Sequence, residues 1–283
     1  MAGGATTANL DDTVYAAEFS ANILEELRPA MTSRSFMRWG PLGNSTAFAF
    51  SLQDDPGAAG QNAMTEGTDF STVTDLTSSK QTATAAEVGI MTTVSDVLIK
   101  VSLLDALPHV KGVLNRATLE KWETDVAALV DDFSNVTTAA STLAVDDFLA
   151  AVSALEQRDI PGPYVGYLHP KQSGELRREI AATTALVTAD EAGGVQMTGQ
   201  KSGDFGSLFG THIYFTSLVV NTSSLRGGAV FASGQALGAY EIWGPRIEVE
   251  RRASLRGFYV VASACYGLVE VSDVRGQTIK SVA

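Results

Sequence analysis

The sequence has few of the residues that build disulfide frameworks and metal centres. It contains one cysteine, Cys265, and three histidines, His109, His169 and His212, which lie far apart along the chain. A single cysteine excludes an intramolecular disulfide, and no histidine has another ligand at the spacing that zinc sites use. We therefore predict no metal and no cofactor. Cys265 is expected to be a small buried side chain, and the histidines to have structural or exposed roles.

Charged residues are also scarce, and basic residues most of all. They make up 18% of the chain, with 20 basic against 32 acidic residues and a net charge of −12. A protein that grips nucleic acid needs a basic face, and only the last 83 residues lean basic, with 8 basic against 6 acidic residues. Tight, sequence-specific DNA binding is therefore not expected. A surface with so little charge favours cover by partner subunits.

Long apolar runs are missing as well. No run reaches the roughly 18 residues of a membrane span. The start, "MAGGATTANL", has neither the basic nor the apolar region of a signal peptide. The sequence therefore predicts a chain that is made in a cytoplasm, is not exported by the usual route and does not enter membranes.

One stretch resembles a phosphate-binding loop without matching it. "GGVQMTGQKSGD", residues 193–204, spaces Gly194 and Gly199 as the motif requires, but Gln200 stands before Lys201. The residues next to it, "GDFGSLFG", are turn-like, so a flexible loop is predicted. No nucleophile elbow is present, and the acidic pairs are adjacent in sequence, so their side chains point apart. We predict no catalytic residues and no enzyme activity.

The first half of the chain predicts an arm, a hairpin and a long helix. Apolar residues at helical spacing predict a short amphipathic helix between Val14 and Leu27. Phe48, Phe50 and Leu52 alternate as in a strand, and about 27 small and polar residues separate them from a second extended run, 81–93. A two-stranded ribbon is marginal alone in water, so it is expected to lie across another subunit. A mobile surface loop is the alternative.

The second half of the chain predicts mixed α/β structure followed by strands. Residues 95–133 predict helix, interrupted or started afresh at Pro108, with a rod of about 25 residues and nearly 40 Å. Residues 145–180 predict a helix, a strand and a second helix. Residues 210–283 predict mostly strands, with "AYEIW" and "RIEVERR" separated by the turn signal Gly244-Pro245. The fold class is α+β.

This order of elements resembles the major capsid proteins of tailed bacteriophages, the Hong Kong 97-like fold family. The segments that carry the resemblance are "DLTSSKQTATAAEVG", "YVGYLHPKQSGELR" and "GTHIYFTSLV…RGGAVFASGQALGAYEIWGPRIEVERRASLRGFYVVASACYGLVEVSDVRGQTIKSVA". It covers almost the whole chain, and element order carries more of it than any single motif. It implies an N-terminal arm at 1–44, an extended β-hairpin loop at 45–92, a peripheral domain with a spine helix and β-sheet at 93–142, an axial α/β domain at 143–235, and peripheral return strands at 236–283.

The resemblance also implies a function and partners. Hexamers and pentamers of the chain would form an icosahedral shell in the virion, assembled in the bacterial host cytoplasm around double-stranded DNA without sequence-specific contacts. The arm is too short to contain a scaffolding domain, so a separate scaffolding protein is implied, with a portal and an optional decoration protein. The alternatives are an encapsulin-type nanocompartment shell that holds a cargo enzyme, and a monomeric β-rich binding module.

A set of aromatic and charged residues on the hairpin and the late strands is predicted to form the assembly interface between subunits. These residues are Phe48, Phe50, Glu66, Lys80, Trp243, Arg246, Glu248, Arg251 and Arg252. Exposed ion pairs are weak singly, but a shell repeats them many times. Some relatives cross-link covalently through a loop lysine. Lys80 lies in that region without a visible acceptor constellation, so cross-linking is not expected.

Overall fold

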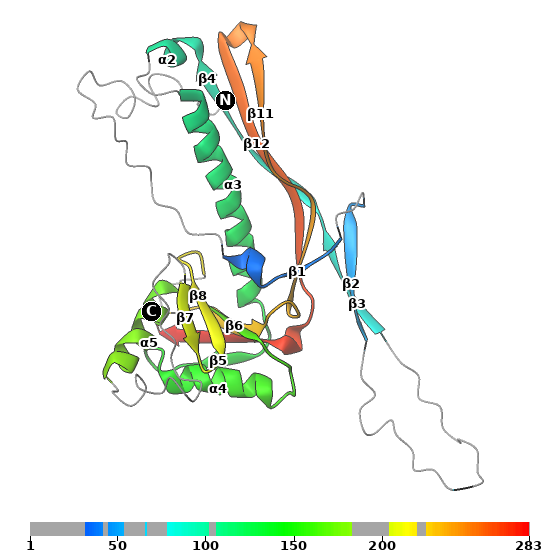
Figure 1. Cartoon of the computed structure of the whole chain (residues 1–283), viewed down its shortest axis with the longest axis vertical. Coiled ribbons are helices and arrows are strands. Elements are labelled where there is room, and N and C mark those ends of the chain that lie inside the picture. Colours follow the sequence, from blue (N-terminus) through cyan, green and yellow to red (C-terminus); the bar gives the residue numbers. More distant parts are fainter. Residues whose placement is uncertain are drawn as a thin grey trace.

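The structure is a computed structural model of the whole chain, and it describes residues 32–41, 45–53, 66, 78–101, 106–182, 204–219 and 225–282. The predicted helix between Val14 and Leu27 and almost all of the "GGVQMTGQKSGD" stretch lie outside these residues. The molecule is elongated: a long helix and long strands occupy one end, a smaller α/β unit occupies the other, and a two-stranded ribbon stands to one side (Figure 1).

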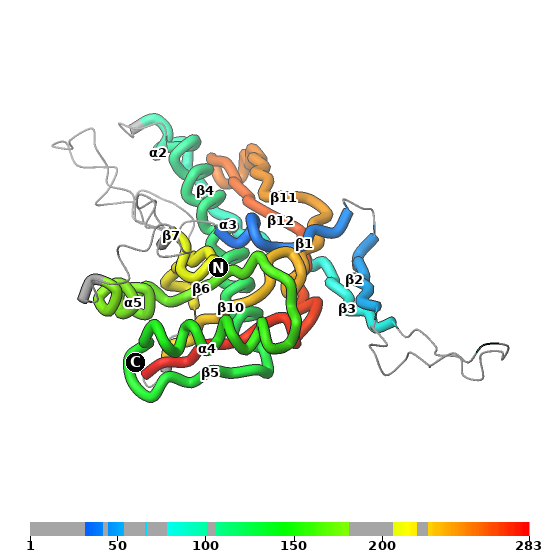
Figure 2. Tube along the Cα trace, turned by 60° about the horizontal axis from the view of Figure 1, so that its bottom comes forward, coloured from blue at the N-terminus to red at the C-terminus, as the bar shows by residue number. Residues whose placement is uncertain are grey.

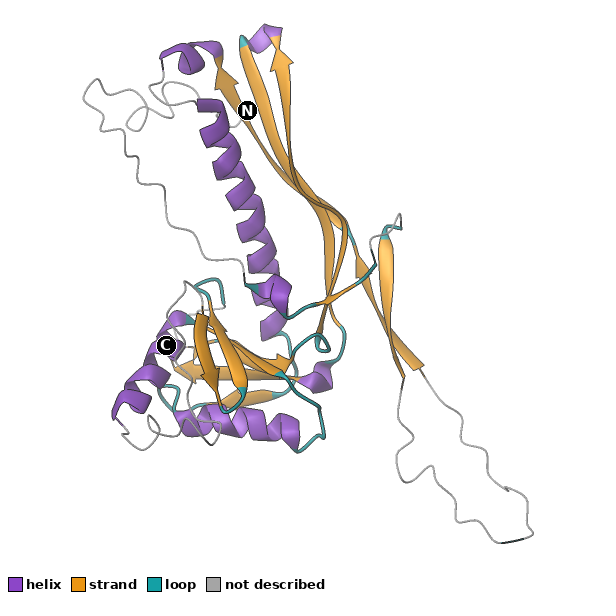
Figure 3. Ribbon diagram, viewed as in Figure 1, coloured by secondary structure: helices purple, strands orange, loops and turns teal. Residues whose placement is uncertain are grey.

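The elongated end is built on a four-stranded sheet with the strand order β1-β11-β12-β4. These strands are β1 (Arg38–Trp39), β11 (Leu237–Arg252), β12 (Gly257–Glu270) and β4 (Ala86–Ser95). The helix α3 (Ala106–Asp131) lies along one face, and the short α2 (Asp96–Val101) follows β4 (Figure 3). The 26-residue α3 confirms the predicted long helix. Pro108 does not interrupt this helix, because it falls in the first turn, where the missing N–H costs no helical hydrogen bond.

β11 differs from the prediction, which placed a break at Gly244-Pro245. The strand runs on to Arg252, with register shifts between Glu241 and Trp243 and again between Trp243 and Arg246. β1 pairs with β11 at Gly238 and Ala239, and beyond that point no described strand pairs with this side of β11, so it is an edge strand within the described residues. A proline is tolerated at an edge or a bulge, because its missing N–H removes no ladder bond there.

The other end is built on a seven-stranded sheet with two helices. Its main order is β5-β13-β10-β6-β8-β7, and β9 also pairs with β13. The strands are β5 (Val136–Thr138), β6 (Tyr164–Leu168), β7 (Asp204–Leu208), β8 (Thr211–Phe215), β9 (Leu225–Arg226), β10 (Gly228–Ala232) and β13 (Gly276–Val282). The helices are α4 (Val145–Glu156) and α5 (Pro170–Ala182), and with β6 they confirm the predicted helix–strand–helix order.

The two sheets share one apolar core, so the ends of the molecule are not independent. A single cluster joins Trp122 of α3, Tyr167 of β6, Phe231 of β10, Leu237 of β11 and Ala264 of β12. A separate cluster fills the space between α4, α5 and the seven-stranded sheet. Because burial of apolar side chains is the main stabilising term in folding, the shared cluster fixes one end against the other.

The ribbon consists of β2 (Ala47–Gln53) and β3 (Ser78–Thr84), paired antiparallel from Ala47↔Thr84 to Gln53↔Ser78. It stands beside the body in both views (Figures 1 and 2). Both predicted extended runs are strands, but the second one divides. Its first part pairs with β2, and from Ala86 onward the chain belongs to the four-stranded sheet as β4.

Candidate assembly surfaces

The base of the ribbon is fastened to β11 by aromatic side chains. The rings of Phe48 and Phe50 meet edge to face at 4.9 Å, and Phe48 stacks on Tyr240 at 5.7 Å. The Tyr240 hydroxyl donates a hydrogen bond to the Ser45 carbonyl oxygen at 2.7 Å. Phe50 is only 2% exposed. Phe48 and Phe50, two of the predicted interface residues, therefore contact groups of their own chain in this structure.

Two glycines allow the ribbon to approach the sheet closely. A Cβ atom on Gly238 would lie 2.8 Å from the Phe50 ring, and one on Gly267 would lie 2.5 Å from the Thr84 carbonyl oxygen. Real Cβ atoms do not come this close to their neighbours, so a side chain at either position would displace the ribbon. The position of the ribbon thus depends on glycine, which has no side chain, at position 238 of β11 and at position 267 of β12.

Four of the predicted interface residues share one face of the four-stranded sheet. On β12, Val260 and Ala262 pack with residues of α3. Because side chains alternate along a strand, the odd-numbered residues of β12 point to the opposite face, here called the outer face. The strand register pairs Trp243, Arg246, Glu248 and Arg252 with outer-face residues of β12, namely Cys265, Ser263, Val261 and Gly257.

The outer-face side chains contact one another. The Arg246 guanidinium lies 4.6 Å from the centre of the Trp243 ring, and its Nε donates to Ser263 Oγ at 3.3 Å. Arg246 and Glu248 form an ion pair at 3.4 Å, and both are exposed. The indole N–H of Trp243 is buried and finds no hydrogen-bond partner among the described residues. The outer face therefore presents a charged patch beside an unsatisfied donor.

The remaining predicted residues lie elsewhere. Arg251 points to the face that α3 covers, where it pairs with Asp96, and its hydrogen bond holds the pKa of that carboxyl below its ordinary value. Lys80 is exposed on β3, opposite Ser51. Glu66 is also exposed. The structure thus brings Trp243, Arg246, Glu248 and Arg252 onto one face, and it separates Arg251, Lys80 and Glu66 from them.

A buried carboxylate that sequence reasoning missed holds the start of the described chain. Glu123 of α3 is 1% exposed. Its Oε1 accepts hydrogen bonds from the Thr32 amide at 2.8 Å, the Ser33 amide at 3.1 Å and Ser33 Oγ at 2.9 Å. Its Oε2 accepts from the Tyr167 hydroxyl at 2.8 Å, and burial together with the Glu123 charge raises the pKa of that hydroxyl. Glu123 therefore joins three segments that are distant in sequence.

Aromatic and cationic side chains strengthen the same anchor. Trp39 stacks on Trp122 with ring centres 5.6 Å apart, and the Arg34 guanidinium lies 5.2 Å from each ring. Arg34 also pairs with Glu241 of β11 at 3.2 Å. Glu123 follows Trp122 directly, on the buried and mainly apolar side of α3. An acidic residue among the apolar residues of a helix is the sequence signal that could have revealed the anchor.

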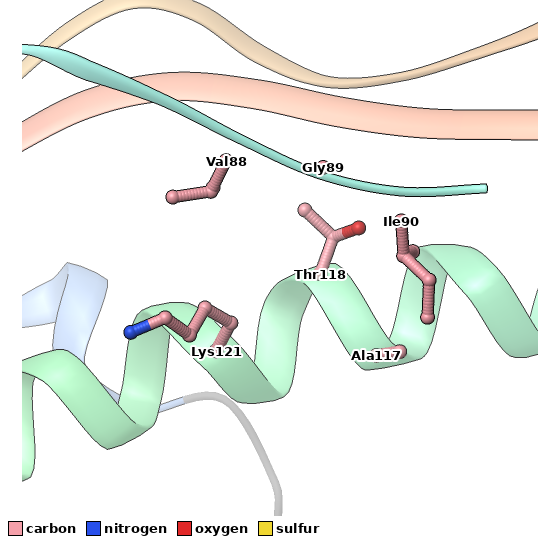
Figure 4. Close-up of a pocket in the computed structure, with 6 residues that line it drawn as sticks. All are labelled: Val88, Gly89, Ile90, Ala117, Thr118 and Lys121. Carbon is pink, nitrogen blue, oxygen red and sulfur yellow. The ribbon is translucent and has the colours of Figure 1, made fainter. Parts of the chain in front are cut away.

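The described residues form an apolar groove of about 400 Å³ between β4 and α3. Val88 and Ile90 reach from β4 toward Ala117, Thr118 and Lys121 of α3 (Figure 4). Nothing in this lining pairs a nucleophile with a base. The described part of the chain holds no group of His, Cys, Asp and Glu that could bind a metal, and none of its helices is long and apolar enough to cross a membrane.

A second acidic group lies where the two sheets connect. Glu270 ends β12, and the turn after it docks on the segment that follows α3, because Asp273 Oδ1 accepts a hydrogen bond from the Ser134 amide at 2.7 Å. Burial, followed by the charges of Asp273 and Asp132, raises the pKa of Glu270 to about 7. In the folded chain, the Glu270 carboxyl therefore keeps its proton to a higher pH than it does in the unfolded chain.

This pKa shift predicts a pH dependence of stability. Because the folded state binds the extra proton, the contribution of Glu270 is most favourable below its ordinary pKa of 4.5 and is lost as the pH rises to about 7. Denaturant unfolding of the wild type and of Glu270→Gln across this range should show a fall in the wild type that the variant lacks. Asp159→Asn, at an exposed turn, is the control and should keep the wild-type slope. Parallel curves for wild type and Glu270→Gln would contradict the shift.

Comparison with known proteins identifies the fold. No protein-family model and no curated protein sequence matches the chain. Among solved structures, the capsid of cyanophage P-SCSP1u is similar with a TM-score of 0.72 and 15% identity, over 96% of this chain and 94% of that chain. A structure of Mycobacterium phage Che8 has a TM-score of 0.72 and 16% identity, over 93% and 96%. The capsid of an empty GTA particle has a TM-score of 0.64 and 14% identity, over 100% of both chains.

The chain therefore has the fold of phage capsid chains, and the Hong Kong 97-like capsid fold predicted from the sequence is confirmed. Several further similar structures are also capsids of bacteriophages. At identities of 10–16%, the likeness rests on the arrangement of elements and not on shared side chains.

Proposed function

We propose that this chain is the major capsid protein of a tailed phage, and that it self-assembles through hexamers and pentamers into an icosahedral shell around double-stranded DNA. The observation that carries the proposal is the two-way coverage of the structural matches. Capsid chains align over 93–100% of this chain and over 92–100% of their own length. A chain with the whole fold, and little added to it, fits the same structural task.

The shape of the chain supports assembly. The ribbon stands beside the body, and all residues of β3 except Ala83 are exposed. A two-stranded ribbon is marginal in water on its own. Contact with a second subunit would stabilise it. We assign residues 1–44 as the arm, 45–92 as the extended loop that lies over the peripheral domain of the adjacent subunit, 93–142 and 236–283 as that peripheral domain, and 143–235 as the axial domain.

The outer face is the surface that we assign to intersubunit contact. The Trp243 indole N–H is buried and has no hydrogen-bond partner among the described residues, and a donor left without an acceptor costs free energy. Around it, Arg246, Glu248 and Arg252 offer charges that can re-pair with a neighbour. Lys80 and Glu66 belong to the loop that would reach such a surface, and Arg251 would act at the far end of the sheet.

The proposed partners follow from the same role. A separate scaffolding protein would direct assembly, a portal would occupy one vertex, and a decoration protein could bind outside. The packaged DNA would meet the wall without sequence-specific contacts, since a net charge of −12 does not attract phosphates. The chain would lie in the virion capsid after assembly in the host cytoplasm, and it would have no enzyme activity. No observation favours the nanocompartment alternative.

Sedimentation velocity and electron microscopy of the purified protein, alone and with the candidate scaffolding protein, test this function. We expect closed shells about tens of nanometres across. Heterologous contacts between many subunits build such shells when the contacts close on themselves. A monomer under both conditions, with a ribbon that proteases cut freely, would contradict the proposal and favour a binding module.

A further inference from the structure

A short segment at the start of the described chain leads to the ribbon. Residues 32–41, here called the strap, comprise η1 (Ser33–Ser35) and β1, and the described chain resumes at Ser45, just before β2. The strap begins against α3 and passes beside β11 toward the ribbon (Figure 1). Because Glu123 accepts hydrogen bonds from the first two residues of the strap, this end is fixed to α3.

Arg34 fastens the strap to α3 and β11 together. Beyond its contacts with the Trp39 and Trp122 rings, its Nη2 donates hydrogen bonds to both carboxylate oxygens of Glu241, at 3.2 and 3.3 Å. The Trp39 indole N–H donates to the Arg34 carbonyl oxygen at 3.2 Å. A guanidinium can stack on aromatic rings and pair with a carboxylate at the same time. One side chain therefore holds the strap against both of its neighbours.

The other end of the strap touches the ribbon. The Arg38 guanidinium lies 5.9 Å from the centre of the Phe50 ring. The Gly40 amide donates a hydrogen bond to the Ala239 carbonyl oxygen at 2.8 Å. A Cβ on Gly40 would lie 2.9 Å from Cδ1 of Phe48, so strap and ribbon are in direct contact there. The strap thus links α3 to both aromatic side chains that fasten the ribbon.

The ribbon has room to move on its other side. A cavity of about 450 Å³ separates part of it from the α/β end. Gln53 and Gln81 of the ribbon line one wall, and Arg158 after α4 and Asp273 after β12 line the other. Because a cavity supplies few contacts to its walls, packing on this side does little to hold the ribbon. The strap therefore stands out as a contact that could fix the ribbon in place.

We propose that the strap is a latch that sets the position of the β2–β3 ribbon. While Ser33 is held by Glu123 and Arg34 by Glu241, the ribbon stays against β11, and release of these contacts frees it to move. A partner that acts on the chain before Thr32 would then reach the ribbon through the strap. The inference goes beyond the proposed capsid function, because it concerns the single subunit. The alternative is a ribbon held by its continuation into β4, without influence of the strap.

The register shifts of β11 offer a way to release Arg34 without changing the strap. A Cβ on Gly244 would lie 2.6 Å from Oε1 of Glu241, so Gly244→Ala should displace this carboxylate from its place beside Arg34. The atom that must move is the end of a flexible side chain, so the subunit should still fold. Arg34→Ala removes the guanidinium itself. The two variants thus break one contact from its two sides.

Distances between spin labels test the latch in the full-length, unassembled subunit. Cysteines replace Ser79 on β3 and Gln157 next to Arg158, both of which are exposed, while Cys265 is buried. Pulsed electron paramagnetic resonance then gives the distribution of distances between the ribbon and the α/β end. Arg34→Ala and Gly244→Ala should each widen this distribution at least about twofold, because a released ribbon samples more positions. The double variant should widen it no further than Arg34→Ala, since both changes act on one contact.

Amide exchange tests the coupling in the opposite direction. Because coupling between two sites is reciprocal, a loosened ribbon must also loosen the strap. Phe48→Ala removes the ring that stacks on Tyr240, and it should raise amide exchange at Ser33 at least about tenfold. The control is Val97→Ala, which changes a 59% exposed side chain of α2, far from the strap (Figure 1). It should leave exchange at Ser33 at the wild-type rate.

Two results would overturn the latch. One is an unchanged distance distribution in both Arg34→Ala and Gly244→Ala, and the other is wild-type exchange at Ser33 in Phe48→Ala. Either would mean that β4 holds the ribbon without the strap, and either leaves the capsid function standing, because no shell is measured. Circular dichroism checks that each variant is folded. Should Arg34→Ala fail to fold, Gly244→Ala decides, since it changes no residue of the strap.

Discussion

Replacing Glu123 with alanine is expected to lower the free energy of unfolding by about 3–5 kcal/mol. The change removes the acceptor of four hydrogen bonds and leaves the buried Ser33 and Tyr167 donors without a charged partner. The site is 1% exposed, so water cannot easily replace the carboxylate. Denaturant unfolding of the unassembled subunit measures the loss.

The Glu123 prediction has a control on the same helix. Glu120 is only partly buried, and Glu120→Ala should cost less than about 1 kcal/mol, as is usual for side chains near the surface. Glu123→Gln keeps one acceptor oxygen and should fall between the two. Amide exchange at Thr32 and Ser33 should rise strongly in Glu123→Ala. A variant as stable as Glu120→Ala would show that the anchor contributes little.

Replacing Gly267 with alanine is expected to displace the ribbon and abolish shell formation. The added Cβ would lie 2.5 Å from the Thr84 carbonyl oxygen and 2.6 Å from its carbon, and these are backbone atoms that cannot rotate away. Overpacking of this kind costs about 1–3 kcal/mol, so the body should still fold. Sedimentation velocity and electron microscopy should find folded subunits and no closed shells.

A matched substitution separates displacement of the ribbon from a general effect of alanine. In α5, a Cβ on Gly174 would meet nothing within 4 Å, and Gly174→Ala should stabilise the helix by about 0.5–1 kcal/mol. It should also assemble as the wild type does. Shells of normal yield from Gly267→Ala would mean that the ribbon position is not required for assembly.

The sequence predicted those elements whose periodic pattern is complete within a single segment. α3, α4 and α5 have apolar residues at helical spacing, and β12 is a long run bounded by turn signals. The continuous β11 was not predictable from Gly244-Pro245, because tolerance of that pair depends on an edge position that only the sheet order reveals. The division of 81–93 into β3 and β4 likewise depends on which partner each part finds.

The candidate surfaces were predictable in part. Alternation along β11 places Arg246, Glu248 and Arg252 on one side and Arg251 on the other, and this period of two is visible in the sequence. The place of Trp243 beside Arg246 depends on the register shift between these two residues, which no local pattern indicates. Glu123 was missed because a buried carboxylate is stable only with donors from residues that are about 44 to 91 positions away in the chain.

The described surfaces would suit the contacts between copies that the proposed function requires. The described residues combine a fastened ribbon and a charged outer face on one elongated body. Such surfaces differ from one another, so they favour heterologous contacts, which build closed shells when the geometry closes.

Cryo-electron microscopy of particles assembled from the wild-type chain tests the central claim most directly. The account predicts a closed icosahedral shell of this chain, with the ribbon of each subunit on a neighbouring subunit. Monomers alone and with scaffold, or particles in which the ribbon touches only its own chain, would contradict it.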